Sequence, residues 1–301
     1  MTMWRFAHIT DFHLGSQVDG EWNNNFLCTM MPDVMSCLRR DLAKLNPDFV
    51  LATGDIASQQ TRDAMFAARD LMDSLGVPYY PMGGNHDFVL EESRQWFLEA
   101  FEAHLPVRDT VYSFTHNNLH FCVLDAWWKW GDDSLFPYSE RTANAGLDRT
   151  LDDEWAIPPH QFAWLEDDLA SNRDTPAIVA VHYPAISIPD RLRHPELKDG
   201  GSLANGSLLL ELLEGFPHVK AVFSGHVHMH FVARRGGITQ VVTGALPEFP
   251  TEYREVRVYE DRLEILTHGL SDTSFAARSL IPGRDWTAGE PCDRTVTIAL
   301  V

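Results

Sequence analysis

The chain has 301 residues and a formal net charge of −19, from 24 Lys and Arg residues against 43 Asp and Glu residues. So acidic a surface repels the nucleic-acid backbone, which argues against binding to long DNA or RNA. The hydrophobic share of 45% and the charged share of 22% are ordinary for a globular protein with a substantial core. The length allows either one large α/β domain or two smaller ones.

The cysteines and the N-terminus predict a location. The four cysteines (Cys28, Cys37, Cys122 and Cys292) lie far apart without paired spacing, as expected of mostly buried thiols in a reducing compartment. The first residues run directly into a predicted strand without a signal region, and no apolar run is long enough to cross a bilayer. We therefore expect a cytoplasmic protein without membrane contact. The sequence leaves the oligomeric state open, and a homo-oligomer is compatible with it.

The first third of the chain alternates strands and helices. Strands are predicted over residues 4–10, 48–53 and 77–82, and helices over residues 29–45 and 61–75. Because strand–helix–strand connections are almost always right-handed, these three strands are expected to be parallel.

The rest of the chain is mixed. Helices are predicted over residues 91–104, 160–170 and 202–214, and a hairpin over 111–115 and 120–124 around Asn117-Asn118. Further strands are predicted over residues 177–181, 219–224, 239–243, 254–259 and 262–267. Residues 271–291 have no regular pattern, and 295–300 are a candidate last strand.

Residues 126–159 form an irregular stretch rich in Trp and Asp. An insertion of this length in a compact domain usually has a function. Trp127, Trp128 and Trp130 are candidates for stacking on a nucleobase or capping a pocket. The alternative, which the sequence leaves equally open, is that they pack an oligomer contact or the small core of the insertion itself.

Polar side chains that can bind metal ions follow five of the predicted strands. They are Asp11 with His13, Asp55, Asn85 with His86 and Asp87, His182, and His226 with His228. Since ligands of α/β sheets gather at the carboxyl ends of the strands, we expect these groups to converge. Imidazole, carboxylate and carboxamide without cysteine suit two divalent metal ions such as Mn, Fe, Zn or Co.

Each motif alone is weak, because a lone histidine after a strand is usually structural and Gly-Asp or Gly-Asn pairs are common in turns. Their occurrence together, each after a strand, favours a metal site. Glycines before Asp55, Asn85 and His226 let the backbone turn sharply there. The remaining histidines are predicted to be structural, with His194 and His230 the strongest candidates for exceptions.

The series Asp-x-His, Gly-Asp, Gly-Asn-His-Asp, His and Gly-His-x-His resembles the motif set of the calcineurin-like metallophosphoesterase superfamily. The Gly-Asn-His-Asp element and the chain length are most similar to the class III cyclic-nucleotide phosphodiesterase and glycerophosphodiesterase branch, over about residues 4–267. The resemblance implies a four-layer α/β/β/α sandwich with two mixed β-sheets flanked by helices. It also implies a dinuclear metal site at the C-terminal ends of the strands.

The resemblance further implies a role for each motif residue. The first metal ion would be bound by Asp11, His13, Asp55 and His228. The second would be bound by Asp55, Asn85, His182 and His226, so that Asp55 bridges the two ions. His86 matches the histidine that lies near the scissile phosphate without binding metal, and Asp87 would orient it.

The expected activity is hydrolysis of a small phosphodiester, of the cyclic-nucleotide or glycerophosphodiester type. Hydroxide shared by the two metal ions would attack phosphorus in line with the leaving oxygen. Protonated His86 would either donate a proton to that oxygen or bind the equatorial oxygens of the phosphate. The alternatives are a phosphomonoesterase or nucleotide pyrophosphatase on the same metal core and, from another class, a non-catalytic interaction module. Residues 1–270 would form the catalytic domain, with 126–159 as a cap or oligomer contact, and residues 271–301 a C-terminal tail.

Overall fold

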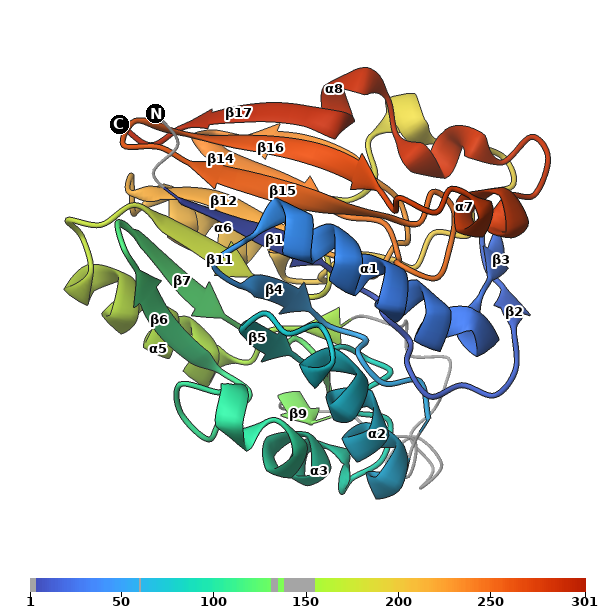
Figure 1. Ribbon diagram of the computed structural model, residues 1–301. Helices are drawn as coiled ribbons and strands as arrows, with labels where there is room; N and C mark the ends of the chain where they lie inside the picture. The colour runs from blue at the N-terminus through green and yellow to red at the C-terminus, as the bar shows by residue number, and fades with distance from the viewer. Residues whose placement is uncertain (1–3, 60, 131–134, 138–154) are drawn as a thin grey trace.

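The computed structural model describes residues 4–59, 61–130, 135–137 and 155–301, and its centre is a pair of six-stranded sheets (Figure 1). The first sheet has the order β17 (Thr295–Ala299), β16 (Arg262–Gly269), β15 (Glu252–Val258), β1 (Trp4–Ile9), β4 (Val50–Thr53) and β5 (Tyr79–Met82). The second has the order β13 (Phe231–Arg235), β14 (Ile238–Val242), β12 (Val219–Ser224), β11 (Ala177–Ala180), β7 (Leu119–Val123) and β6 (Tyr112–His116). Both sheets are mixed, and β1, β4 and β5 are parallel as expected.

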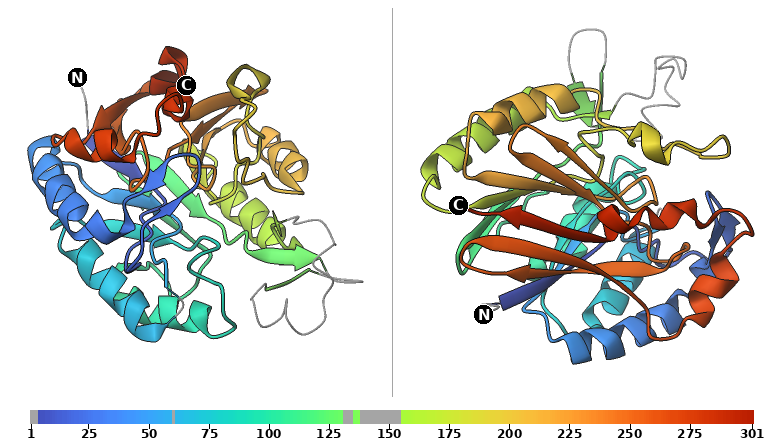
Figure 2. Two further views of the ribbon diagram at one scale, coloured as in Figure 1. Left: turned by 90° about the vertical axis from the view of Figure 1, so that its right-hand side faces the viewer. Right: turned by 90° about the horizontal axis from the view of Figure 1, so that it is seen from above.

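Helices cover the outer face of each sheet, as the two sides of the left view in Figure 2 show. On the first sheet lie α1 (Met31–Leu45), α2 (Arg62–Asp73) and α3 (Ser93–Ala100); on the second lie α5 (Pro159–Ser171) and α6 (Gly206–Glu214). This arrangement confirms the expected four-layer α/β/β/α sandwich with two mixed sheets.

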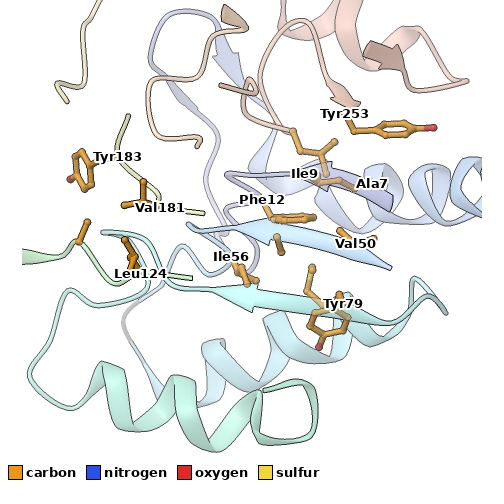
Figure 3. Close-up of a cluster of buried hydrophobic side chains, with 14 of the residues drawn as sticks. Ala7, Ile9, Phe12, Val50, Ile56, Tyr79, Leu124, Val181, Tyr183 and Tyr253 are labelled. Atoms are coloured by element: carbon orange, nitrogen blue, oxygen red, sulfur yellow. The ribbon is translucent and has the colours of Figure 1, made fainter. Parts of the chain in front are cut away.

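Strand β1 shows how the sequence builds these layers. Alternate side chains of a strand point to opposite faces. Phe6 packs between the sheets, with its ring centroid 5.4 Å from Phe121 and 6.0 Å from Phe223. Ala7 and Ile9 lie in the outer cluster together with Val50 (Figure 3). Side chains of α1 belong to the same cluster. The strand is thus buried on both faces, which holds the backbone that follows it in a rigid position.

Short elements complete the described residues. They are β2 (Gly20–Glu21), β3 (Asn25–Phe26), β8 (Trp128–Trp130), β9 (Leu135–Pro137), β10 (Trp155–Ala156), α7 (Ser274–Ser279), α8 (Pro291–Arg294) and the 3₁₀ turns Cys28–Met30, Glu102–His104, Asp190–Leu192 and Asp285–Ala288. None of the helices in these parts of the chain is long and apolar enough to span a bilayer. Of the cysteines, Cys292 is exposed and the other three are buried.

Three expectations about irregular or missing elements are wrong. The stretch 126–159 contains the antiparallel sheet β10-β8-β9, whose strands are too short to show a hydrophobic period. The segment 271–291 contains α7, a helix of six residues that is likewise too short to show a hydrophobic period. Strand β13 was not predicted, because it ends in Arg234-Arg235 and lies at a sheet edge. The tail contributes β17, which pairs with β16; the division at residue 270 stays a prediction.

Candidate metal centre

Side chains from both sheets meet at one edge of the sandwich in two overlapping donor groups. The first donor group is Asp11, His13, Asp55 and His228, and the second is Asp55, His182 and His226; within each group one ligand atom per residue lies within 4.8 Å of the others. Asn85 Oδ1 joins the second group, 3.2 Å from His182 Nε2 and 3.1 Å from His226 Nδ1. The structure therefore brings together all seven residues that the family resemblance assigns as metal ligands, with Asp55 common to both groups.

Most of these residues have a strained backbone. The residues with φ between 48° and 68°, in the left-handed region, are Asp11, His13, Asp55, His226 and His228. Each such residue other than glycine costs about 1–3 kcal/mol, and strain of this kind persists where the surrounding structure enforces it, often at functional sites. Here the backbone N–H of Asp11 donates to Gly54 O at 3.0 Å and that of His13 to Asp55 O at 2.9 Å, which holds the loops after β1 and β4 together.

Three of the histidines have an acceptor on the ring nitrogen that faces away from the donor groups. The acceptors are Thr53 O for His182 Nδ1 (2.8 Å), Gly200 O for His226 Nε2 (2.6 Å) and Glu248 Oε2 for His228 Nδ1 (2.8 Å). An acceptor at one nitrogen keeps the proton there and leaves the lone pair of the other nitrogen free. In their neutral forms, His182 and His228 would therefore bind a metal ion through Nε2 and His226 through Nδ1.

The oxygen Asp11 Oδ1 tests whether a cation fits here. It is buried without a hydrogen-bond partner among the described residues, although His228 Nε2 is only 3.2 Å away and His182 Nε2 3.9 Å. A buried carboxylate oxygen without a partner is costly, and a divalent cation between these atoms would satisfy it. Nitrogen and oxygen donors without thiolate match Mn, Fe, Zn and Co, so the residues present fit the expected metal ions.

Without a cation, protons on the histidines balance the buried carboxylates. Burial lowers the pKa of His182, but the carboxylates of Asp55 and Asp11 outweigh this and raise it to about 9. Burial likewise lowers the pKa of His228, and Asp11 together with Glu248 raises it to about 10. Burial raises the pKa of Asp11, yet His182 and His228 bring it down to about 2.

We expect metal binding to release protons, because a metal ion binds only the neutral form of His182 and His228. Both pKa values lie above the ordinary 6.5, so both rings are protonated at pH 7 in the metal-free protein. Apparent metal affinity should rise with pH from 7 through about 9–10 and then level off. Calorimetric titration of Mn²⁺ at pH 7, in two buffers of different ionisation enthalpy, should show about two protons released per chain. Equal heats in both buffers would contradict this.

The loop after β5 carries the two residues expected to act in catalysis. His86 is exposed, and its backbone N–H donates to Asp55 Oδ1 at 2.8 Å. Asp87 is buried and accepts hydrogen bonds from the backbone N–H groups of Ile56, Ala57 and Gly84. Burial and nearby Asp55 raise the pKa of Asp87 to about 7. Asp87 thus fixes the backbone that carries His86; a contact with the His86 ring stays a prediction.

Gly225 lies where the backbone passes directly over the first donor group. A Cβ at this position would collide with Thr10 Oγ1 and Asp11 Oδ2. We expect Gly225→Ala to weaken metal binding and to lower the free energy of unfolding by about 1–3 kcal/mol, as overpacking does. Gly237→Ala is the matched control, because no atom lies within 4 Å of its added Cβ. Denaturant unfolding and metal titration of both variants test this. Equal stability and equal metal affinity of the two variants would refute the claim that the backbone of Gly225 must pass close to Asp11.

A cavity of about 660 Å³ opens onto both donor groups. His86, Asn85 and the donor-group residues His13, Asp55, His226 and His228 line it, with Trp22, Phe26, Trp127, Trp155 and Tyr183. None of the described residues that line it is Lys or Arg. A second hollow of about 780 Å³, near Arg173 and Lys220, contains none of the donor residues.

Among the tryptophans of the insertion that the structure describes, Trp127 and Trp155 are buried and Trp128 is half-buried. Trp127 is only 8% exposed and stacks on Trp155 with ring centroids 3.7 Å apart. Trp128 lies 5.2 Å from the His160 ring. For Trp127 this favours the packing alternative over stacking on a nucleobase. The side chain of Trp130 lies outside the described residues.

The sequence did not indicate the three acceptors that orient the histidines. Two are backbone carbonyls, which carry no residue-type signal. Glu248 lies in the loop after β14, several residues beyond the end of the strand and without a motif around it, so the strand-end rule does not single it out. The two histidines considered as exceptions are not in the donor groups: His194 stacks on Trp286 at 5.0 Å, and His230 lies 3.3 Å from Glu252.

Two mixed sheets with overlapping carboxylate and imidazole groups at one edge define the class of dinuclear metallophosphoesterases, which are metal-dependent phosphoester hydrolases. Residues 5–230 match the model of the calcineurin-like phosphoesterase family. The chain belongs to this family.

Two relatives agree with this assignment, and a solved structure shares the fold. The chain is 25% identical to a 3',5'-cyclic-nucleotide phosphodiesterase of Nostoc sp., over 77% of this chain and 74% of the relative. It is also 25% identical to the glycerophosphodiester phosphodiesterase GpdQ of Enterobacter lignolyticus, over 85% of this chain and 82% of the relative. A dimetal phosphatase from Danio rerio shares the fold, with a TM-score of 0.71, 17% identity and full coverage of both chains. The relatives named here match the branch expected from the motifs.

Proposed function

We propose that the protein hydrolyses a small phosphodiester, of the cyclic-nucleotide or glycerophosphodiester type, at a dinuclear metal centre. The observation that carries the proposal is that Asp55 belongs to both donor groups and lies beside His86 in one cavity. The relatives from Nostoc and Enterobacter, both phosphodiesterases by name, support a diester substrate.

Each donor group would bind one ion. Asp11, His13, Asp55 and His228 would hold the first ion, and Asp55, Asn85, His182 and His226 the second. When bound, the two ions supply a water molecule of lowered pKa and neutralise charge on the phosphoryl oxygens. Asn85 is the one neutral oxygen ligand, so it adds a donor without reducing the positive charge that an anionic substrate needs.

The residues of the chain position the substrate and move a proton. His86 is exposed in the cavity, and its backbone N–H donates to Asp55 Oδ1, which holds the backbone of His86 beside the donor groups. It donates a proton to the leaving alkoxide, a contribution typically worth about 10²–10⁴ in rate. Asp87 holds the loop in place through its three backbone contacts.

The charge of the cavity favours a diester over the alternatives. A phosphodiester carries one negative charge, whereas monoesters and pyrophosphates carry more and are commonly clamped by Arg or Lys. Among the described lining residues none is Lys or Arg, so the metal ions, together with His86 when it is protonated, would offset the charge of the substrate. The cavity volume of about 660 Å³ suits a small molecule, and the net charge of −19 disfavours a polymeric nucleic acid.

A substrate panel tests the proposal. Bis-p-nitrophenyl phosphate, p-nitrophenyl phosphate, cyclic AMP and a glycerophosphodiester are each assayed with Mn²⁺, Fe²⁺ or Zn²⁺ and with a chelator control. We expect kcat/KM for a diester to exceed that for the monoester, and the chelator to abolish both. A preference for the monoester would favour the phosphomonoesterase alternative. Failure to hydrolyse any substrate would favour a non-catalytic module.

A further inference from the structure

A buried carboxylate outside the expected ligand set contacts the first donor group. Glu248 is 0% exposed and lies in the loop after β14. Its Oε2 is 2.8 Å from His228 Nδ1, and its Oε1 accepts a hydrogen bond from the backbone N–H of Asn24. Both oxygens are therefore engaged, and His228 is the ionisable partner of this buried charge.

Asn24 connects Glu248 to the C-terminal tail. Its side chain is buried, and its Oδ1 accepts a hydrogen bond from the N–H of Ile281 at 2.8 Å. Its Nδ2 donates to Arg284 O and to Thr287 Oγ1, both at 3.1 Å. Residues 281–287 lie beyond residues 5–230, the part of the chain that matches the family model. A segment outside that match therefore binds Asn24, and Asn24 in turn binds Glu248.

We propose that Glu248 is a positioning residue for the metal ligand His228, and that Asn24 with residues 281–287 keeps Glu248 in place. This inference rests on the proposed role of His228 as a ligand. The carboxylate fixes the proton of His228 on Nδ1 and so directs the Nε2 lone pair toward the centre, where Asp11 Oδ1 lies at 3.2 Å. The tail is thereby part of the metal centre.

Glu248→Gln separates positioning from simple packing because it has nearly the same shape. A carboxamide has one acceptor oxygen and one NH₂ donor, whereas Glu248 accepts at both oxygens. If NH₂ faces His228, Nδ1 must become the acceptor and the proton moves to Nε2, which blocks metal binding there. If NH₂ faces Asn24, it meets the backbone N–H. Either arrangement disturbs the ligand or its support.

The test measures metal affinity rather than activity. We expect Glu248→Gln to weaken one of the two Mn²⁺ binding steps by about 10–100-fold, the usual effect of removing such a partner, and to leave the other step unchanged. Glu255→Gln is the matched control: it makes the same change in a second His–carboxylate pair, His268 Nε2 to Glu255 Oε2 at 2.9 Å, and neither residue belongs to a candidate metal-binding group of the described residues. It should leave both steps unchanged. Unaltered binding in folded Glu248→Gln would overturn the inference.

Two further comparisons keep the result interpretable. His228→Asn should lose one Mn²⁺, and if it keeps both ions, the proposed ligand set is wrong. If His228→Asn loses one ion but Glu248→Gln binds both normally, only the positioning role of Glu248 is refuted. Asn24→Ala keeps the backbone N–H that Glu248 uses and removes the side-chain bonds to the tail. It should weaken the same step several-fold, and unchanged binding would refute the contribution of the tail.

A spectroscopic measurement on the unmutated protein avoids any folding defect of the variants. In ¹⁵N-histidine-labelled, Zn²⁺-loaded protein, with His228 assigned by its loss in His228→Asn, the ring proton should reside on Nδ1. The hydrogen bond to the carboxylate should shift that proton downfield. A proton on Nε2 would overturn the inference.

Discussion

Asp55→Asn is expected to remove both metal ions and to lower kcat/KM for a phosphodiester by at least about 10³-fold. Asp55 is the one residue common to both donor groups. The amide nitrogen of Asn has no lone pair for a metal ion, so the variant cannot bridge, and it also lacks the negative charge. Charge stabilisation by the ions is worth several kcal/mol, and each 1.36 kcal/mol is a tenfold change in rate.

The number of metal ions bound per chain of this variant is measured by mass spectrometry after dialysis, together with its kinetics. Asp41→Asn serves as the control, because Asp41 is also buried but contacts Ser271 N at 2.8 Å, away from both donor groups. It should keep its metal and its activity. Retention of two ions by Asp55→Asn would contradict the shared role of this carboxylate.

His86→Ala is expected to keep both metal ions and to lose most of kcat on substrates with a poor leaving group. The side chain is exposed and belongs to neither donor group, so its removal should barely affect stability or metal content. Loss of a positioned proton donor costs about 10²–10⁴ in rate when the leaving group needs a proton. A p-nitrophenolate leaving group needs none, and its loss of rate should therefore be much smaller.

The comparison between leaving groups is the decisive part of the His86 experiment. Kinetics of bis-p-nitrophenyl phosphate and of a glycerophosphodiester are measured with the same metal-loaded preparation. Equal losses on both substrates would indicate that His86 binds phosphate oxygens instead. Full activity on the glycerophosphodiester would exclude the proton-donor role.

Much of the donor set was predictable from the sequence, because most of its residues lie directly after a strand and a strand can be recognised from its local sequence. Asp55 directly follows β4, and His226 follows β12, so recognising a buried strand places the residue at the end of it. Parallel strands buried on both faces read as continuous apolar runs, which made β4, with the sequence Val-Leu-Ala-Thr, easy to find. The layers of the fold then follow from the alternation of these strands with helices.

The rest depended on tertiary structure. The left-handed backbone of His13 and His228 is unfavourable for any residue except glycine, so only the surrounding fold can enforce it. Glu248 contacts His228 through the loop that follows β14, which has no metal-binding motif of its own. The edge strand β13 lacks an apolar run because it needs only one buried face and ends in two arginines.

The most direct test of a dinuclear phosphodiesterase is a stoichiometric metal titration of its activity. Metal-free protein is titrated with Mn²⁺ while hydrolysis of bis-p-nitrophenyl phosphate is followed. Because Asp55 is shared by both donor groups, we expect activity to saturate at two ions per chain and a chelator to abolish it reversibly. Hydrolysis that persists in the metal-free protein, or that is complete with one ion per chain, would contradict a two-metal centre.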